Sequence, residues 1–104
     1  MAWSKAKPII IDGIEFGSIV EGRDYQALKL LLAAGDISDL KLQPRFRLEV
    51  NGELIGHYKA DFMYTEKHGA TVVYERKGRV SRDFPLRWKL CQALYPQYKY
   101  VLKK

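Results

Sequence analysis

The chain lacks the features that mark secreted, disulfide-bonded and membrane-spanning proteins. Its 104 residues include one cysteine, Cys91, so it forms no internal disulfide and no zinc site built on several cysteines. No apolar run approaches the roughly 18–20 residues of a membrane-spanning helix. The first residues also lack the apolar core of a secretion signal. We therefore expect a cytoplasmic protein, in a reducing compartment, that makes no contact with a membrane.

Internal repeats and low-complexity segments are absent as well. The length suits one domain over residues 1–104, and a chain of this size buries enough surface to fold without a disulfide or a metal. With 47% hydrophobic and 29% charged residues, the composition is that of an ordinary globular protein and excludes a disordered chain.

Acidic residues are scarce in the last quarter of the chain, although the net charge of +6 is moderate. Residues 76–104 hold nine lysines and arginines against one acid, Asp83, whereas residues 1–75 hold nine basic and eleven acidic side chains. The first part therefore carries a net charge of −2 and the last part +8. Such an asymmetry favours a surface that faces a polyanion, and nucleic acid is the first candidate.

Residues 19–34 are flanked by sequence signals for the start and the end of a helix. Ser18 and Glu21 have the spacing of a capping box, apolar residues recur at helical intervals, and Gly35 follows where a helix would stop. A second helix is expected to begin at residues 83–85, where Pro85 suits a first turn, and to end near residue 95, before Pro96.

Between the two helices the apolar pattern changes to a period of two, which is typical of strands. We expect one strand over residues 40–50, a turn at Asn51-Gly52, a return strand over 54–65 and a third strand over 71–77. Pro44 places the first strand at an edge or makes it begin after the proline. A short edge strand at 8–11 and a last strand near 98–102 complete an α+β order: helix, three-strand antiparallel meander, helix, strand.

Charged side chains on the second and third strands form the best candidate for chemistry. Glu75 and Lys77 lie two residues apart and therefore share one face of a strand. If the strand that carries Asp61 pairs directly with theirs, the two carboxylates stand about 5 Å apart. Carboxylates this close repel unless a cation lies between them, and Mg²⁺ prefers such oxygen ligands. Asp61, Glu75 and Lys77 are thus a compact set for hydrolysing phosphodiesters.

The wider sequence around this set resembles the PD-(D/E)XK nuclease superfamily, and more closely a group of small phage-encoded endonucleases or Holliday-junction resolvases. The resemblance covers about residues 16–95. It is carried, in order, by Ser18-x-x-Glu21, Leu42-Gln43-Pro44, Tyr58-x-Ala60-Asp61-Phe62-x-Tyr64, Val73-Tyr74-Glu75-Arg76-Lys77-Gly78 and a helix with Leu86, Lys89 and Leu90. One departure is Ala60 before Asp61, where the superfamily name has proline.

The resemblance implies a restriction-endonuclease-like core and assigns roles to the motif residues. Asp61 and Glu75 would bind Mg²⁺, for which Mn²⁺ could substitute, and the backbone carbonyl of Arg76 would be a third ligand. Lys77 would be the catalytic lysine, Glu21 would complete the acidic cluster from the first helix, and Gln43 would support the site.

The expected function is metal-dependent cleavage of DNA, branched or duplex, with a preference for a particular DNA structure and with no small-molecule substrate. Four basic residues after the third strand are expected to contact the DNA backbone: Arg79, Arg82, Arg87 and Lys89. Cutting both strands of a junction favours a homodimer. A phage-encoded enzyme of this kind would act in the cytoplasm of the bacterial host.

The residues also allow plainer interpretations. Glu21 completes a helix cap with Ser18, while Asp61, Glu75 and Lys77 could form salt bridges on a solvated strand face. The basic residues could serve solubility alone. A nuclease of the same fold acting on other DNA or on RNA, a non-catalytic nucleic-acid-binding phage protein, and an interaction module with a basic face all remain open.

Overall fold

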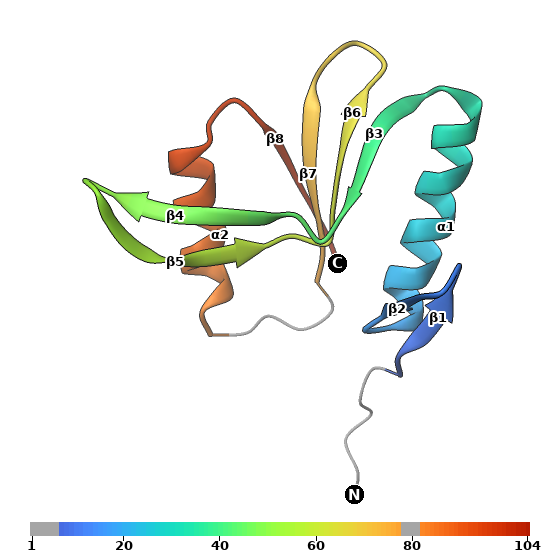
Figure 1. Cartoon of the computed structure of the whole chain (residues 1–104), viewed down its shortest axis with the longest axis horizontal. Helices are drawn as coiled ribbons and strands as arrows, with labels where there is room; N and C mark the ends of the chain where they lie inside the picture. The colour runs from blue at the N-terminus through green and yellow to red at the C-terminus, as the bar shows by residue number, and fades with distance from the viewer. Residues whose placement is uncertain (1–6, 78–81) are drawn as a thin grey trace, which may run out of the picture.

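The computed structural model describes residues 7–77 and 82–104 and has an α+β architecture (Figure 1). A central four-stranded sheet has the strand order β3-β6-β7-β8, and two hairpins, β1–β2 and β4–β5, form separate two-stranded sheets. The elements are β1 (Ile9–Ile11), β2 (Ile14–Phe16), α1 (Ile19–Ala34), β3 (Ile37–Leu42), β4 (Arg45–Val50), β5 (Glu53–Lys59), β6 (Phe62–Glu66), β7 (Thr71–Arg76), α2 (Phe84–Leu94) and β8 (Lys99–Lys103).

Helix α1 has the predicted bounds. The Ser18 side chain accepts a hydrogen bond from the Glu21 N–H at 3.1 Å and so caps the first turn. The last turn ends at Gly35, whose φ of 80° is the left-handed conformation that favours glycine. The β1–β2 hairpin lies against the helix at Gly22, where a Cβ atom would come within 2.8 Å of Ile11 Cδ1. The absence of a side chain there permits this close approach.

The two long strands expected at 40–50 and 54–65 are each divided, which corrects the sequence prediction. Gln43 adopts a φ of 51°, and β4 begins directly after Pro44. Opposite this break, β5 ends and β6 starts on either side of Ala60 and Asp61. The segments change partners as a result: β3 pairs with β6, while β4 pairs only with β5. The start of β4 agrees with the alternative that the strand begins after Pro44. The break at Ala60 and Asp61 was not predicted, because side-chain alternation does not report a change of backbone direction.

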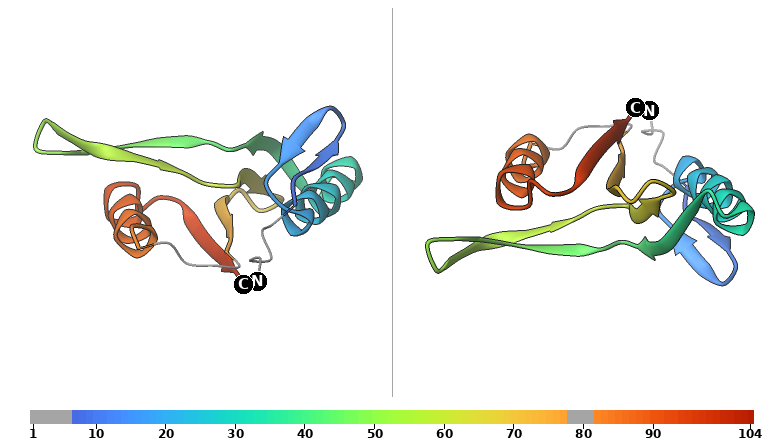
Figure 2. Two further views of the ribbon diagram at one scale, coloured as in Figure 1. Left: turned by 90° about the horizontal axis from the view of Figure 1, so that it is seen from below. Right: turned by 90° about the horizontal axis from the view of Figure 1, so that it is seen from above.

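The antiparallel meander therefore consists of β3, β6 and β7, and the β4–β5 ribbon extends from it. Strand β8 pairs with β7 in parallel, through a crossover that contains α2. Asp83 precedes α2 and Pro85 lies in its first turn, as predicted. Figure 2 shows the β4–β5 ribbon running along one side of α2. No helix in the described part of the chain is long and apolar enough to cross a membrane.

The core has two clusters, one on each face of the central sheet. The α1 side holds Phe16, Tyr25, Leu28, Ile37, Phe62, Val72 and Tyr74. The α2 side holds Phe46, Leu48, Tyr58, Ala60, Met63, Val73, Phe84 and Cys91. Side chains of a strand alternate between faces, so Glu75 follows Val73 to the α2 side and Arg76 follows Tyr74 to the α1 side.

Packing of the ribbon on α2 can be tested with Leu48→Ala. Leu48 is 1% exposed within the α2-side cluster, and removing a buried leucine side chain typically costs about 2–5 kcal/mol. The matched variant Leu54→Ala, at a residue of the same ribbon that is 43% exposed, should change the free energy of unfolding by about 0.5 kcal/mol or less. Urea denaturation measures both. Equal effects would show that the ribbon does not pack on the helix.

Candidate active site

The charged residues singled out in the sequence gather where β5, β6, β7 and the first turn of α1 meet. Strands β6 and β7 pair in the register Phe62–Tyr74, and the Asp61 N–H donates to the Tyr74 carbonyl oxygen at 3.2 Å. The expectation that the strands carrying Asp61 and Glu75 are direct neighbours is therefore confirmed.

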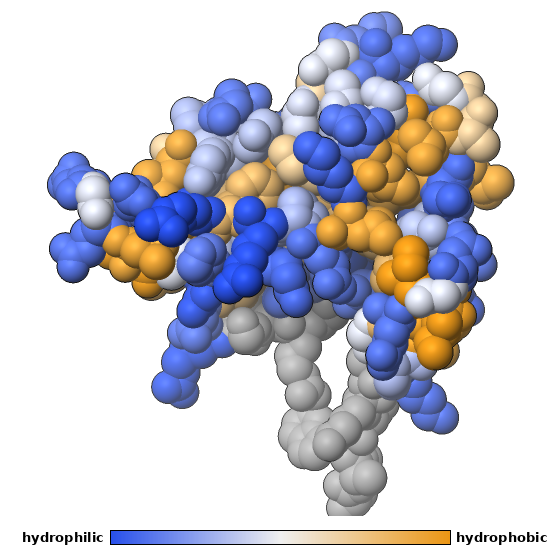
Figure 3. Space-filling model, viewed as in Figure 1, coloured by the Kyte–Doolittle hydropathy of each residue, from blue (hydrophilic) through white to orange (hydrophobic). Residues whose placement is uncertain are grey.

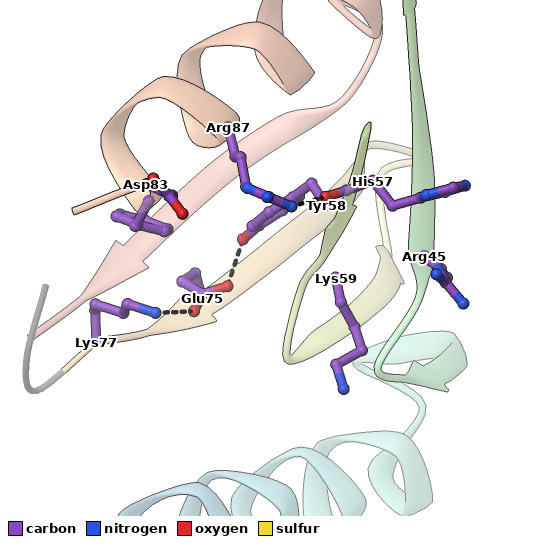
Figure 4. A pocket seen from close by; sticks show the side chains of 9 residues that line it. Arg45, His57, Tyr58, Lys59, Glu75, Lys77, Asp83 and Arg87 are labelled. Atoms are coloured by element: carbon purple, nitrogen blue, oxygen red, sulfur yellow. Dashed lines mark hydrogen bonds and ion pairs between the residues drawn. The ribbon is translucent and has the colours of Figure 1, made fainter. Parts of the chain in front are cut away.

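Glu75 is the buried centre of the site. Its residue is 4% exposed, its Oε1 accepts a hydrogen bond from the Tyr58 hydroxyl, and its Oε2 lies 3.6 Å from Lys77 Nζ (Figure 4). Burial raises the pKa of the Glu75 carboxyl to about 7, and the charge of Asp61 adds to this rise. The hydrogen bond from Tyr58 and the charge of Lys77 act in the opposite direction without cancelling the effect of burial.

Asp61 is held by the backbone of the neighbouring strand. The Arg76 N–H donates to Asp61 Oδ2 at 2.7 Å, and this hydrogen bond lowers the pKa of the carboxyl. Burial is the larger effect and raises the pKa of Asp61 above its ordinary value. Because only Oδ2 takes this bond, Oδ1 is the oxygen left for a further ligand.

Glu21 extends the acidic cluster from α1. Burial raises the pKa of its carboxyl, and the charges of Asp61 and Asp24 raise it further, while Lys77 and Lys59 lower it. The Ser18 side chain caps the helix through the backbone N–H of Glu21, so the cap does not occupy the Glu21 carboxylate. Among the described residues, the structure thus shows one half of the predicted capping box, in which Glu21 takes part through its backbone and not through its carboxylate.

The side chain of Arg76 anchors α1 to β7. Its Nε and Nη2 donate to the two carboxylate oxygens of Asp24 at 2.7 and 2.9 Å, and both side chains are largely buried. This two-point geometry fixes orientation as well as distance. Sequence reasoning did not single out Asp24, because an acid on a helix face is usually solvated. The one signal in the sequence was that Asp24 lies about one helical turn after Glu21.

Gln43 reaches the site through its backbone. The Gln43 N–H donates to the Asp61 carbonyl oxygen at 2.9 Å, and the residue is exposed. The neighbouring Ala60 N–H donates to the Pro44 carbonyl oxygen at 3.1 Å. A proline at position 60 would lack this N–H, so alanine in the Ala60–Asp61 pair preserves a bond between the two strand breaks.

The basic residues predicted to contact DNA do not share one location. Arg87 lines an open pocket beside Glu75, and its Nη1 donates to the His57 carbonyl oxygen at 2.7 Å. Arg82 and Lys89 are exposed but lie outside the lining of this pocket. Arg79 lies outside the described residues.

The pocket has a volume of about 570 Å³. Its lining consists of Arg45, His57, Tyr58, Lys59, Glu75, Lys77, Asp83, Phe84 and Arg87. Lys77 Nζ also lies 4.7 Å from the centroid of the Phe84 ring, within the range of a cation–π contact. Sequence analysis missed Arg45, Lys59 and the hydroxyl of Tyr58. The sequence predicted a strand at Tyr58, but not that its hydroxyl donates a hydrogen bond to Glu75.

Metal binding at this site would depend on few protein ligands. Among the described residues, no group of three or more histidine, cysteine, aspartate or glutamate side chains converges to hold an ion. Mg²⁺ commonly takes one or two carboxylates and completes its shell with water and substrate phosphate. The oxygen donors of Asp61 and Glu75 therefore fit Mg²⁺ and do not fit a closed structural metal site.

The chain belongs to the family described as "Protein of unknown function (DUF1064)", whose family model matches residues 1–104. No curated protein and no solved structure matches the chain. The family description assigns no activity.

Burial of Glu75 predicts a pH-dependent stability in the absence of divalent cations. Between the ordinary pKa of 4.5 and the folded pKa of about 7, the folded state keeps a proton that the unfolded state has lost, so the free energy of unfolding falls as the pH rises. The fall attributable to Glu75 is about 3 kcal/mol. Urea denaturation from pH 4 to pH 8 should show a shallower fall for Glu75→Gln. An identical pH dependence in both proteins would contradict the burial argument.

The contact between Arg76 and Asp24 predicts that the substitution Asp24→Asn makes the folded protein less stable. The amide cannot accept both guanidinium hydrogen bonds, and we expect the free energy of unfolding to fall by about 1–3 kcal/mol. Glu66→Gln is the matched control, because the ion pair of Glu66 with Lys99 is solvent-exposed and its loss should cost about 1 kcal/mol or less. Equal losses of unfolding free energy in the two variants would show that the Arg76–Asp24 contact stabilises the protein no more than an exposed ion pair does.

Proposed function

We propose that this protein is a metal-dependent DNA endonuclease that hydrolyses phosphodiester bonds. The observation that carries the proposal is the buried Glu75 carboxylate, with Lys77 beside it and with Asp61 hydrogen-bonded to the same strand from the break between β5 and β6. A salt-bridge cluster on a solvated strand face would leave these groups exposed. Burying a carboxylate at the wall of an open pocket carries a cost in free energy that a structural role does not explain.

The order of the elements supports the same proposal. A helix, three antiparallel strands, a second helix and a parallel strand follow one another as α1, β3, β6, β7, α2 and β8. This is the succession that the resemblance to PD-(D/E)XK nucleases implies, with the β4–β5 ribbon inserted between β3 and β6. The candidate residues lie at one end of the meander.

Mg²⁺ would be held by Asp61, Glu75 and the backbone carbonyl of Arg76, with Mn²⁺ as a substitute. When bound, the ion would neutralise phosphate charge and lower the pKa of the attacking water. Lys77, held between Glu75 and the Phe84 ring, would stabilise the negative charge that develops on the phosphate. Glu21 would orient the water from the α1 side.

The proposed substrate is branched or duplex DNA, with preference for a four-way junction. Arg87 at the pocket, together with the exposed Arg82 and Lys89, would contact backbone phosphates. Two cuts in a junction require two sites, so the proposal includes a homodimer. A phage origin and action in the cytoplasm of a bacterial host follow from the resemblance and belong to the same proposal.

Cleavage of a labelled four-way junction and of a matched linear duplex tests this function, with Mg²⁺, Mn²⁺ or EDTA present. We expect cleavage that requires the metal. Lys77→Ala should lower the rate by about 10²–10³-fold, because it removes a group that stabilises developing charge. Lys67→Ala, at an exposed lysine in the β6–β7 turn, is the matched control and should cleave at the wild-type rate.

Each outcome separates the proposal from its alternatives. Paired cuts confined to the junction would establish a resolvase, whereas cleavage of both DNAs, or of RNA alone, would indicate a nuclease with another target. DNA binding without cleavage in any metal would favour a non-catalytic nucleic-acid-binding protein. Full activity of Lys77→Ala would exclude the site described here.

A further inference from the structure

The β4–β5 ribbon presents an outer face of four basic side chains. Arg45 pairs in register with Lys59, and Arg47 pairs with His57 two positions further along the ladder, on the same face. The intervening residues of both strands point the other way, into the α2-side core. Figure 3 shows strongly hydrophilic side chains gathered along β4 and β5 on the face turned to the viewer.

Two of these side chains, Arg45 and Lys59, are cations that lie directly opposite each other across the strand pair. Arg47 is paired with Glu49, whose Oε1 accepts from Nε at 2.8 Å. Within residues 7–77 and 82–104, no acidic side chain forms an ion pair with Arg45 or Lys59, and both residues are exposed. Like charges directly across a strand pair are destabilising. The arrangement thus favours an external anion over an internal partner.

This outer face is continuous with the candidate site. Arg45 and Lys59 line the same pocket as Glu75, and the positive charge of Lys59 acts on the carboxyls of Glu21 and Asp61. In Figure 4, Arg87 and Asp83 lie on one side of Glu75, whereas Lys59 and Arg45 lie on the other. The buried carboxylate therefore lies between Arg87 of α2 and the two cations of the ribbon, Arg45 and Lys59.

We propose that the outer face of the β4–β5 ribbon is a phosphate-binding surface for the substrate, with Arg45 and Lys59 contacting backbone phosphates on one side of the pocket and Arg87 on the other. The inference rests on the proposed function and extends it to a part of the chain whose net charge is negative. Such contacts position the sugar–phosphate backbone without reading the base sequence.

The salt dependence of DNA binding tests this surface. Fluorescence anisotropy with a labelled duplex, in EDTA so that metal-dependent cleavage is absent, gives the slope of log Kd against log salt concentration. Each lost phosphate contact lowers that slope by about 0.9, so Arg45→Gln combined with Lys59→Gln should lower it by about 2. From 50 to 200 mM salt, the wild type should then lose about tenfold more affinity than the variant.

Lys29→Gln combined with Lys67→Gln is the control for net charge. It removes the same two positive charges from exposed residues of α1 and the β6–β7 turn, outside the pocket lining, and should leave the slope near its wild-type value. A further readout is stability: relieving the repulsion between Arg45 and Lys59 should leave the urea midpoint unchanged or slightly higher. A lowered midpoint would show a structural role and overturn the inference.

The result for the ribbon is separable from the result for catalysis. An unchanged slope in the Arg45 and Lys59 variant, or one that matches the control, overturns the inference even if the wild type cleaves DNA. A lowered slope supports it even if the cleavage experiment finds no nuclease. A wild-type protein that binds no DNA at low salt also overturns the inference, and the cleavage experiment then decides on the nuclease independently.

Discussion

The two hydrogen bonds between the Arg76 guanidinium and the Asp24 carboxylate are the contact on which the candidate site depends. They join the end of β7 to α1 at 2.7 and 2.9 Å, on the face of the sheet opposite to Glu75. The backbone N–H of the same Arg76 donates to Asp61. A single residue therefore positions the helix that carries Glu21 and the carboxylate of the neighbouring strand. This is possible because side chains of β7 alternate between the two faces of the sheet, so that Glu75 and Arg76 point to opposite faces.

The electrostatic cost of burying charged groups in this site falls mainly on Glu75. Burial and the neighbouring Asp61 both disfavour its ionised form, while the Tyr58 hydroxyl and the Lys77 ammonium favour it. The donors do not fully offset burial, so the pKa stays near 7. A divalent cation placed between the carboxylates would shift the balance toward the ionised form, because it acts on both at once. Among the described residues, the charges around Glu75 therefore leave its carboxyl partly protonated near neutral pH, since its pKa stays near 7.

Local sequence signals predicted those parts of the fold whose cause is local. Ser18 and Gly35 mark the ends of α1 because a side-chain cap and a left-handed glycine act within one turn. The placement of Glu75 and Lys77 followed from strand alternation. Pro44 indicated that a strand begins after it, as β4 does, but the pattern of side chains did not indicate a separate strand β3 before Gln43, whose φ is 51°. Asp24 was missed because its partner lies 52 residues away.

The same strand breaks explain why Arg45 and Lys59 lie opposite each other on the ribbon, a pairing that the sequence did not indicate. Where β5 ends, the chain turns through Ala60 and Asp61 into β6, so that Lys59 remains on the ribbon while Asp61 enters the site. Arg45 begins β4 directly opposite Lys59. Counting charge along the chain hides this pair, because Arg45 and Lys59 belong to the part of the sequence whose net charge is negative. A continuous meander would have spread these residues along one sheet. The division into β3–β6 and β4–β5 instead places Arg45 and Lys59 in the lining of the same pocket as the buried Glu75, a local concentration of positive charge that a count along the chain does not show.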